Sequence, residues 1–332
     1  MLVLGRGLWR KAIAHSRSGE LRWLHRPVLS RTQPKLLGRT IWRRRTVPGI
    51  IWLASYPKSG NTWTRFLIAN YLLNPEEPVP INDIPHLNFI SHDSPINHFE
   101  RFAGKKLEEM EDEEVAAVRG KVHQWLAMSR GRDIFVKTHN LCGIAFGFPL
   151  IAPEATAGAI YIVRNPLDVV PSFAHHFSMT IDRAVEVLCT PEYYLPHAKN
   201  QIRQHLGSWT QHVNSWMKAP GMQRYVMRYE DLHRDPINTV GGLMKFLGLP
   251  PDRQRLEKAI RFSSFDQLQS QEAKEKFKEA REEEDSKFFR SGKTGGWQDV
   301  LSDQQVQTII ENHKDTMKRF GYLDEESKPA VS

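Results

Sequence analysis

A lysine, a serine, a glycine, an asparagine and a threonine follow one another in residues 55–63 (SYPKSGNTW), between an apolar run and a helix-forming segment. The apolar run 50–54 predicts a strand, and residues 61–73 predict a helix. In such a strand–loop–helix unit the N–H groups of residues 59–62 point at an anion, and Lys58 adds a positive charge. The loop therefore predicts a phosphate-binding site. Because the lysine precedes the glycine, the motif differs from the loop of ATPases and GTPases.

Two further strand ends carry polar side chains. The strand predicted at 133–137 ends in Lys137, and His139 follows two residues later; the strand at 159–163 is followed by Arg164 and, two helical turns on, by Ser172. A histidine next to a lysine suits proton removal, because its unperturbed pKa of about 6.5 lies near neutrality. An arginine offers a forked donor to a phosphate, and a serine adds a hydroxyl.

Each motif also has a purely structural interpretation, which stays open at this stage. The first loop would then be a tight turn shaped by Pro57 and Gly60, with Lys58 in solvent. Asp168 would cap the helix that begins at residue 166, and Arg164 would be its ion-pair partner. His139 would be a solvated or structural histidine.

The elements that must position these side chains alternate along the chain. Short β-branched or aromatic runs predict strands, and longer amphipathic stretches predict helices between them, as in a parallel sheet with helical crossovers. The predicted strands are 50–55, 133–137, 159–163 and 225–228, and the predicted helices are 61–73, 166–177 and 236–247. Since ligands of open α/β sheets bind beyond the carboxyl ends of the strands, the polar motifs are expected to converge there.

Length and charge define the domains. The chain has 332 residues, 40% hydrophobic and 25% charged, as in a soluble globular protein with one large core. We expect a basic, poorly ordered extension at 1–45, one domain at 46–324 and a tail at 325–332. The extension holds 12 of the 46 basic residues and one of the 38 acids, so the rest of the chain, with 34 basic and 37 acidic residues, is slightly acidic. Nucleic acid is therefore not an expected partner.

The same extension bears on location. It mixes arginines with Leu and Trp, so a transit peptide and a segment in weak contact with a membrane surface are alternatives to disordered padding, which we favour. No run approaches the ~20 apolar residues that span a bilayer. Cys142 and Cys189 are too few for a disulfide framework, and no two histidines are spaced i, i+4, so no metal site is expected. These features predict a cytoplasmic protein.

Five segments in order carry a resemblance to a known family. YPKSGNTW, VKTH, VRNPLDVVPS, RYEDL and FFRSGKTGGW resemble the successive motifs of the sulfotransferases that use 3′-phosphoadenosine 5′-phosphosulfate (PAPS). The resemblance extends from about residue 50 to about residue 323. It implies a P-loop-like, three-layer α/β fold with a central parallel sheet, and transfer of a sulfuryl group from PAPS to an acceptor hydroxyl without a metal.

The resemblance also implies a role for each motif residue. His139 would take the proton from the acceptor hydroxyl, while Lys58 and Lys137 neutralise charge around the sulfuryl group. The 5′-phosphate would contact Lys58, Ser59, Gly60, Asn61 and Thr62. The adenine would lie near Trp63, Tyr229, Ser263 and Phe265. The 3′-phosphate would be bound by Arg164, Ser172, Arg290, Ser291 and Gly292.

The last motif departs from the common animal pattern R-K-G-x-x-G-D-W. Ser291 replaces its lysine and Gly296 its aspartate, so Lys293 is expected to supply the missing charge. The dimer motif K-x-x-x-T-V-x-x-x-E of many animal relatives has no counterpart, which leaves the oligomeric state open. Residues 85–92 and Trp125 are expected to line the acceptor pocket, whose acceptor is a sugar, a phenol, an alcohol or a lipid.

Two other function classes remain. A P-loop kinase would need a lysine after the loop glycine and a carboxylate for Mg²⁺. A silent nucleotide-binding or scaffolding protein would have no need of Lys58 and His139 together. The sequence thus favours sulfuryl transfer. The run of charges at 272–287 is interpreted as a solvated helical face.

Overall fold

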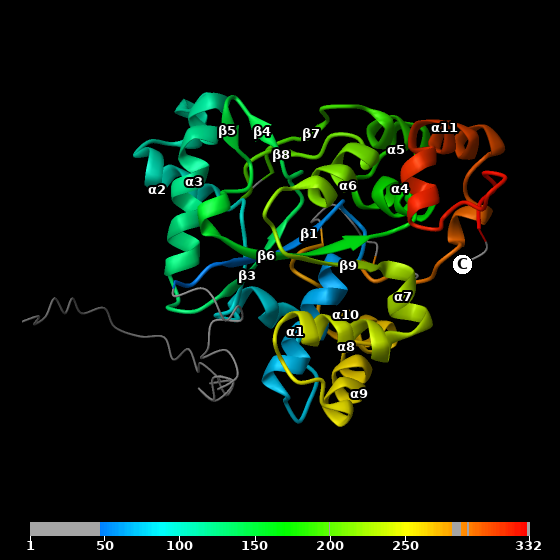
Figure 1. The fold of residues 1–332 in the computed structure, drawn as a ribbon, viewed down its shortest axis with the longest axis horizontal. Helices are drawn as coiled ribbons and strands as arrows, with labels where there is room; N and C mark the ends of the chain where they lie inside the picture. Colours follow the sequence, from blue (N-terminus) through cyan, green and yellow to red (C-terminus); the bar gives the residue numbers. More distant parts are fainter. Residues whose placement is uncertain (1–46, 199, 281–286, 291, 331–332) are drawn as a thin grey trace, which may run out of the picture. The chain divides into compact units, whose positions relative to one another are not determined.

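A parallel sheet of five strands, in the order β2-β3-β1-β6-β9, forms the centre of the part of the chain that the structure describes (Figure 1). The strands are β2 (Ile90–His92), β3 (Ile134–Thr138), β1 (Ile50–Ser55), β6 (Thr156–Val163) and β9 (Arg224–Arg228). Every pairing between them is parallel. This computed structural model describes residues 47–330 except 199, 281–286 and 291, so the extension predicted at 1–45 lies outside the described residues.

The central strand shows why the sheet needs a helical layer on each side. All six residues of β1 are buried. Ile50, Trp52 and Ala54 pack into one hydrophobic cluster, whereas Ile51 and Leu53, which point the other way, pack into a second. A strand with apolar side chains on both faces is stable only when both faces are covered.

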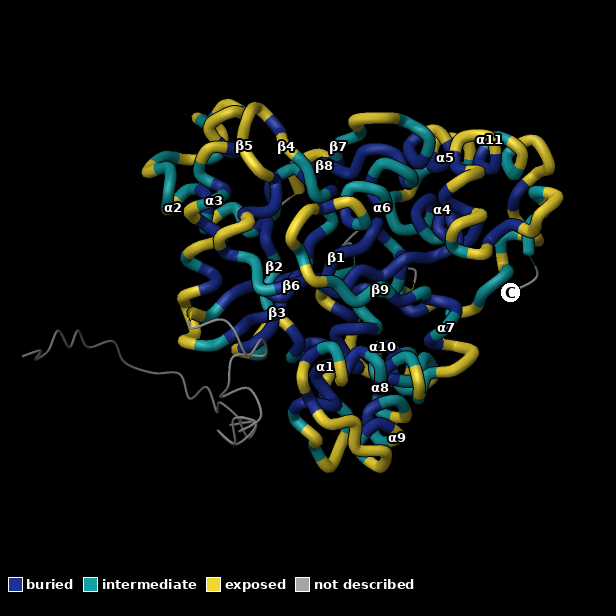
Figure 2. Tube along the Cα trace, in the orientation of Figure 1, coloured by how far each residue is buried: buried dark blue, intermediate teal, exposed yellow. Residues whose placement is uncertain are grey.

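Helices cover both faces of the sheet. One side of the sheet packs against α2 (Ile96–Ala103), α3 (Asp112–Met128), α4 (Pro166–His176), α5 (Ile181–Cys189), α6 (Trp209–Lys218) and α11 (Asp303–Arg319). The other packs against α1 (Asn61–Leu73), α7 (Tyr229–Arg234), α8 (Pro236–Phe246), α9 (Arg253–Phe262) and α10 (Phe265–Lys274). Figure 2 shows the buried sheet between these two layers. The predicted three-layer α/β fold is confirmed.

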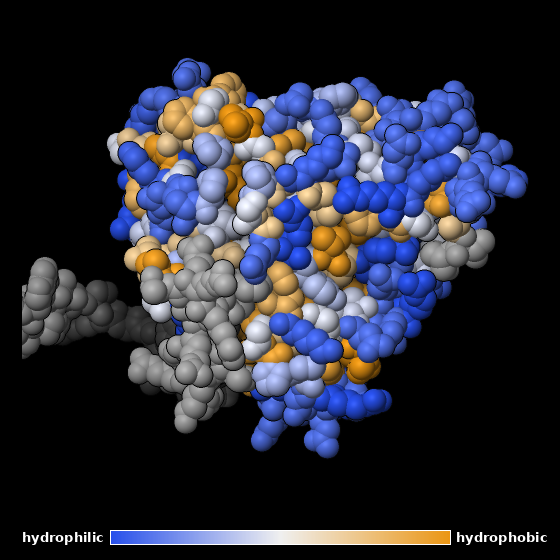
Figure 3. All heavy atoms as spheres, viewed as in Figure 1, coloured by the Kyte–Doolittle hydropathy of each residue, from blue (hydrophilic) through white to orange (hydrophobic). Residues whose placement is uncertain are grey.

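The remaining elements are short and lie in the connections. Two antiparallel hairpins pair β4 (Ile144–Ala145) with β5 (Phe148–Pro149) and β7 (Tyr194–Leu195) with β8 (Gln204–His205). Single 3₁₀ turns are η2 (Ile81–His86), η3 (Leu107–Glu109), η4 (Pro153–Ala155) and η5 (Gly296–Asp299). The hairpin of β4 and β5 exposes Ile144, Phe146 and Phe148. Figure 3 shows hydrophilic and hydrophobic patches side by side on this face.

The predicted elements agree closely with the observed ones. β1 and α1 have the expected bounds, and α4 and α8 end one residue early. β3 is displaced by one residue, because Asp133 accepts a hydrogen bond from the Gly49 N–H (2.8 Å) instead of joining the ladder. The strand β2 was not predicted, since three residues are too few for an alternating pattern.

Candidate active site

A cavity of about 1110 Å³ opens at the carboxyl ends of β1, β3, β6 and β9. Thirteen of the sixteen predicted site residues line it: Lys58, Gly60, Asn61, Thr62, Trp63, Lys137, His139, Arg164, Ser172, Tyr229, Phe265, Arg290 and Gly292. Ser59 is buried just beneath this lining, and Ser291 lies outside the described residues. Ser263 is enclosed by the fold, where its hydroxyl accepts a hydrogen bond from Asn70 Nδ2 (3.0 Å); it is not part of the lining.

The loop between β1 and α1 has the geometry of an anion cradle. Gly60 is the N-cap of α1 with φ 101°, and no side chain of the described residues caps this helix end. A β-carbon at Gly60 would lie 2.7 Å from a ring carbon of Tyr229, so a side chain here would clash as well as strain the backbone. Asn61 ties the loop to the strand by donating to the Leu53 carbonyl (2.8 Å). The first N–H groups of α1 therefore face the cavity in a fixed arrangement.

The buried polar atoms of the site that have no hydrogen-bond partner among the described residues include three donors, Ser59 Oγ, Trp63 Nε1 and Arg164 Nε. The acceptor Asn61 Oδ1 is also without a partner among these residues. A buried donor without a partner costs about 1–3 kcal/mol. All three can donate, so the site fits an oxygen-rich anionic ligand such as a nucleotide phosphate.

Arg164 joins the cradle to the Gly-rich turn near the C-terminus. Its guanidinium donates to the carbonyls of Lys58 (3.0 Å) and Lys293 (3.1 Å) and lies 4.1 Å from the centre of the Tyr229 ring. Asp168 does not act as its ion-pair partner; the carboxylate accepts hydrogen bonds from the N–H groups of Gly295 (2.9 Å) and Trp297 (3.2 Å). The ion pair of the structural interpretation is therefore wrong, because Asp168 holds the turn; Arg164 lines the cavity and bonds to two backbone carbonyls.

The Gly-rich turn packs directly on Phe265. A β-carbon at Gly292, whose φ is 62°, would lie 2.2 Å from a ring carbon of Phe265. Phe265 in turn contacts Phe289 edge to face, with 6.3 Å between ring centres. Only glycine permits this approach, which brings the predicted adenine contact and the predicted 3′-phosphate turn to one wall.

His139 lies at the end of β3 with one ring nitrogen engaged. Its Nδ1 is 2.8 Å from the Ser55 carbonyl oxygen, which can only accept, so Nδ1 carries the proton and Nε2 has the free lone pair. Burial, followed by the charge of Lys137, holds the pKa of His139 well below its ordinary value. The imidazole is neutral at pH 7 and can accept a proton at Nε2.

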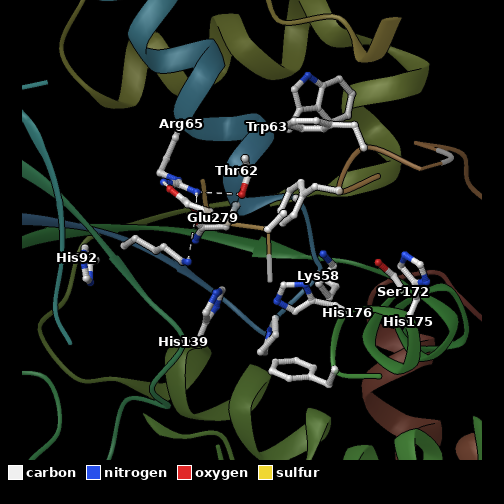
Figure 4. Close-up of a pocket in the computed structure, with 18 of the residues that line it drawn as sticks. Lys58, Thr62, Trp63, Arg65, His92, His139, Ser172, His175, His176 and Glu279 are labelled. Carbon is white, nitrogen blue, oxygen red and sulfur yellow. Dashed lines mark hydrogen bonds and ion pairs between the residues drawn. The ribbon is translucent and has the colours of Figure 1, made fainter. Parts of the chain in front are cut away.

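An ion-pair cluster that sequence reasoning missed lies beside Lys137 (Figure 4). Glu279 makes a bidentate pair with Arg65, both N···O distances being 2.6 Å, and lies 4.0 Å from Lys137 Nζ. Burial opposes the charge on Glu279, but Arg65 outweighs it and keeps the pKa of the carboxyl far below its usual range. Burial is also the main cause that lowers the pKa of Lys137.

The charged run 272–287 is thus not simply a solvated face. Glu272 accepts hydrogen bonds from the N–H groups of Phe288 (2.7 Å) and Phe289 (2.9 Å), and Glu279 turns into the cavity. One signal in the sequence could have indicated this ion pair. Arg65 lies one turn into the largely buried helix α1, and a buried cation needs an acidic partner. Phe288 also contacts the catalytic candidate Lys58, whose Nζ lies 4.2 Å from the ring centre.

The cavity has two sides that differ in origin. We call the residues of 57–63, 164–172 and 289–297 with Tyr229 and Phe265 the cradle side, and the residues of 85–98 and 195–204 the loop side. Pro85, Ile90, Ser91 and His92 line the loop side as expected. Trp125 does not; it packs against the His98 ring, with 4.7 Å between ring centres, and only His98 reaches the cavity.

Two kinds of feature are absent from the residues that the structure describes. In this part of the chain, no three His, Cys, Asp or Glu side chains are grouped so that they could hold a metal ion. No helix in it is both long and apolar enough to span a membrane.

The chain belongs to the sulfotransferase family, since the sequence model of the Sulfotransferase domain matches residues 48–321. It is 26% identical to flavonol 3-sulfotransferase of Flaveria bidentis over 277 residues, which cover 79% of this chain and 80% of that protein. It is 25% identical to mouse Sulfotransferase 1E1, covering 82% and 84%. The predicted family and the predicted transferase activity are confirmed.

Solved structures share the fold. Mouse sulfotransferase SULT7A1 complexed with PAP has a TM-score of 0.54 at 21% identity, covering 86% of this chain and 90% of that one. Retinol dehydratase with androsterone and the inactive cofactor PAP has a TM-score of 0.56 at 18% identity, covering 84% and 83%.

Proposed function

We propose that this sulfotransferase binds PAPS on the cradle side and transfers its sulfuryl group to a hydroxyl of a small molecule held on the loop side. The observation that carries the proposal is that two features lie together at the carboxyl ends of the strands. The cradle side ends in buried, unpartnered donors, and His139 presents a free ring nitrogen beside Lys137. The names of the relatives, among them a flavonol sulfotransferase, support a small-molecule acceptor.

The donor contributes an activated sulfuryl group, and the chain's residues position and neutralise it. The backbone N–H groups of Ser59, Gly60, Asn61 and Thr62 bind the 5′-phosphate. Arg164 and Ser172 bind the 3′-phosphate with the turn at Arg290 and Gly292, and Lys293 adds the charge that Ser291 lacks. Trp63, Tyr229 and Phe265 enclose the adenine.

The chemical step needs a base and two cations. His139 Nε2 takes the proton of the acceptor hydroxyl as its oxygen bonds to sulfur, and the bond from sulfur to the bridging phosphate oxygen breaks. Lys58 stabilises the charge that develops on this leaving oxygen, and Lys137 that on the sulfuryl oxygens. A sulfuryl group carries less charge than a terminal phosphoryl group, so side-chain cations are sufficient for the task.

Calorimetry with two nucleotides tests the donor. PAP should bind at least 10-fold more tightly than AMP, because each charge-assisted hydrogen bond to the 3′-phosphate contributes about 1.5–3 kcal/mol. EDTA should not change either affinity. Equal affinity for the two nucleotides, or ATP binding that depends on Mg²⁺, would contradict the proposal and point to a silent nucleotide-binding protein or a kinase.

Three further properties stay predictions. A cytoplasmic location is testable by fractionation. Weak contact between the basic residues of 1–45 and a membrane is testable by salt-sensitive binding to anionic vesicles. The oligomeric state is measurable by sedimentation.

A further inference from the structure

We propose that the acceptor is an uncharged, hydroxyl-rich molecule, a sugar or sugar alcohol unit, bound by amide and imidazole groups of the loop side. This inference rests on the proposed function, because it names the acceptor of the same site. It narrows the four acceptor classes that the sequence left open to one.

The two sides of the cavity are lined by different kinds of side chain. The cradle side is aromatic, with Trp63, Tyr229, Phe265, Phe289 and Trp297. In the described parts of the loop side, no Phe, Tyr or Trp lines the cavity. Its polar lining is formed by Ser91, His92, Asn97, His98, His197, Asn200, Gln201 and Gln204. The apolar part of this lining is aliphatic, formed by Pro85, Ile90, Pro95, Leu195, Pro196 and Ala198, so it offers no aromatic ring on which a flat phenol could stack.

The loop-side wall has a fixed backbone. The Ile96 N–H donates to the Asn200 carbonyl (3.2 Å), and the Ile202 N–H donates to the Ser94 carbonyl (2.9 Å). Ala198 and Gln201 exchange a pair of backbone hydrogen bonds (2.9 and 3.1 Å). These bonds hold the two segments together, so the side chains on them are presented in defined positions to a ligand.

Two imidazoles of this wall have unused hydrogen-bonding capacity. The Nδ1 atoms of His92 and His98 are buried and have no hydrogen-bond partner among the described residues. Burial lowers the pKa of both rings, that of His92 to about 4, so each is neutral at pH 7 and offers one donor and one acceptor. A hydroxyl group, which also donates and accepts, matches the hydrogen-bonding capacity of a neutral imidazole in the lining.

Two amides complete the wall. Gln204, which is buried, donates from Nε2 to Gln201 Oε1 (3.3 Å) and fixes the orientation of both side chains. The Gln201 amide nitrogen, which lines the cavity, is then directed by this bond and can donate to a hydroxyl oxygen.

The wall begins beside the reaction centre. His92 of β2 pairs in register with Lys137 of β3. A sugar whose reacting hydroxyl lies at His139 would therefore place its neighbouring hydroxyls against the imidazoles and amides. An acceptor without those hydroxyls would leave buried polar groups unpaired, and sites of this kind reject such analogues strongly.

A panel of acceptors with labelled PAPS tests the inference. It contains hexyl β-D-glucoside, a sugar alcohol, 1-hexanol, 4-nitrophenol and a steroid alcohol. We expect kcat/KM for the glucoside to exceed that for 1-hexanol and the phenol by about 100-fold or more. A phenol or a steroid alcohol as the best acceptor would overturn the inference.

A pair of variants tests whether the Gln201 amide contributes to the preference for the glucoside. Gln201→Leu keeps the side-chain volume and removes the amide, so kcat/KM for the glucoside should fall about 10-fold or more while the affinity for PAP is unchanged. Gln307→Leu, at a surface position of α11 away from the cavity, is the matched control and should change neither. Equal kcat/KM in Gln201→Leu and wild type would contradict the inference.

PAP affinity separates this inference from the proposed function. Without PAP binding, the proposed function fails and the inference fails with it. With PAP binding and sulfation of a phenol, only the inference fails. With PAP binding and no turnover of any acceptor, saturation-transfer NMR on the enzyme–PAP complex decides, and absence of glucoside binding would overturn the inference.

Discussion

The cradle side and the loop side face the same cavity, yet the fold builds them in different ways. The cradle side comes mainly from residues next to a strand end, where the first turn of a helix and a short loop fix the backbone within a few positions. The loop side comes from two segments about 100 residues apart that are held together by backbone hydrogen bonds. The first is rigid because of local geometry, and the second because of long-range pairing. We therefore expect the first to set the donor and the second to set the acceptor.

The largest expected effect lies where the two sides meet. His139→Ala should reduce kcat by about 10²–10⁴-fold and leave PAP affinity nearly unchanged, because a general base acts in the transition state. In wild type, the depressed pKa of His139 predicts that kcat/KM falls only as pH drops well below 6.5, when Nε2 becomes protonated. Stopped assays from pH 4.5 to 8 measure the kcat of the variant and the pH dependence of wild-type kcat/KM. Full activity of His139→Ala would show that His139 is not the general base.

The second test concerns Glu279, which pairs with Arg65 of α1 and lies 4.0 Å from Lys137 of β3. Glu279→Gln leaves Arg65 buried without its carboxylate and should lower the free energy of unfolding by about 3–5 kcal/mol. The control is Glu257→Gln, which breaks the exposed pair with Arg253 and should have little effect. Urea denaturation compares them. Equal stabilities of the two variants would show that the Arg65–Glu279 pair contributes no more than a surface pair.

A substitution on the cradle side alone should separate donor from acceptor. Arg164→Gln is expected to weaken PAP binding about 10–150-fold, because it removes charge-assisted hydrogen bonds, and to leave the KM of the acceptor at saturating PAPS nearly unchanged. Calorimetry measures the PAP dissociation constant, and steady-state kinetics at saturating PAPS measures the KM of the acceptor. If the acceptor KM rises as much as the PAP dissociation constant, the two sides are not independent.

The smallest effect is expected outside both sides. Removing residues 1–45 should leave kcat, the acceptor KM and PAP affinity unchanged, because the predicted motifs and the sheet all lie beyond them. Expression and assay of residues 46–332 test this. Loss of soluble protein would indicate that the extension is needed for folding.

The two sides also differ in how well the sequence predicted them. The strand β1, the helix α1 and the cradle between them were predicted to the residue, because an apolar run, a Gly-containing loop and a helix leave their pattern in consecutive positions. Trp125 and Ser263 do not line the cavity. Trp125 packs against His98 and Ser263 bonds to Asn70, and sequence pattern alone does not give the contacts of a single side chain.

Long-range contacts were the main source of error. Glu279 belongs to a run of charges that is typical of a solvated helix, and only its partner Arg65, more than 200 positions earlier, distinguishes it. The loop side depends on backbone hydrogen bonds that join Ser94 to Ile202 and Ile96 to Asn200, and the side chains of such paired loops give no periodic signal.

The two hydrogen bonds from Arg164 to the carbonyls of Lys58 and Lys293 have a consequence for synthesis of the protein. A chain that grows on the ribosome exposes the cradle early, but Lys293 and the turn that Asp168 holds emerge only near the end. The complete nucleotide clamp therefore exists only in the nearly finished chain. A product that terminates just before residue 293 would contain all five strands and the loop between β1 and α1 but lack Lys293 and the turn held by Asp168, so we expect it to bind the nucleotide weakly.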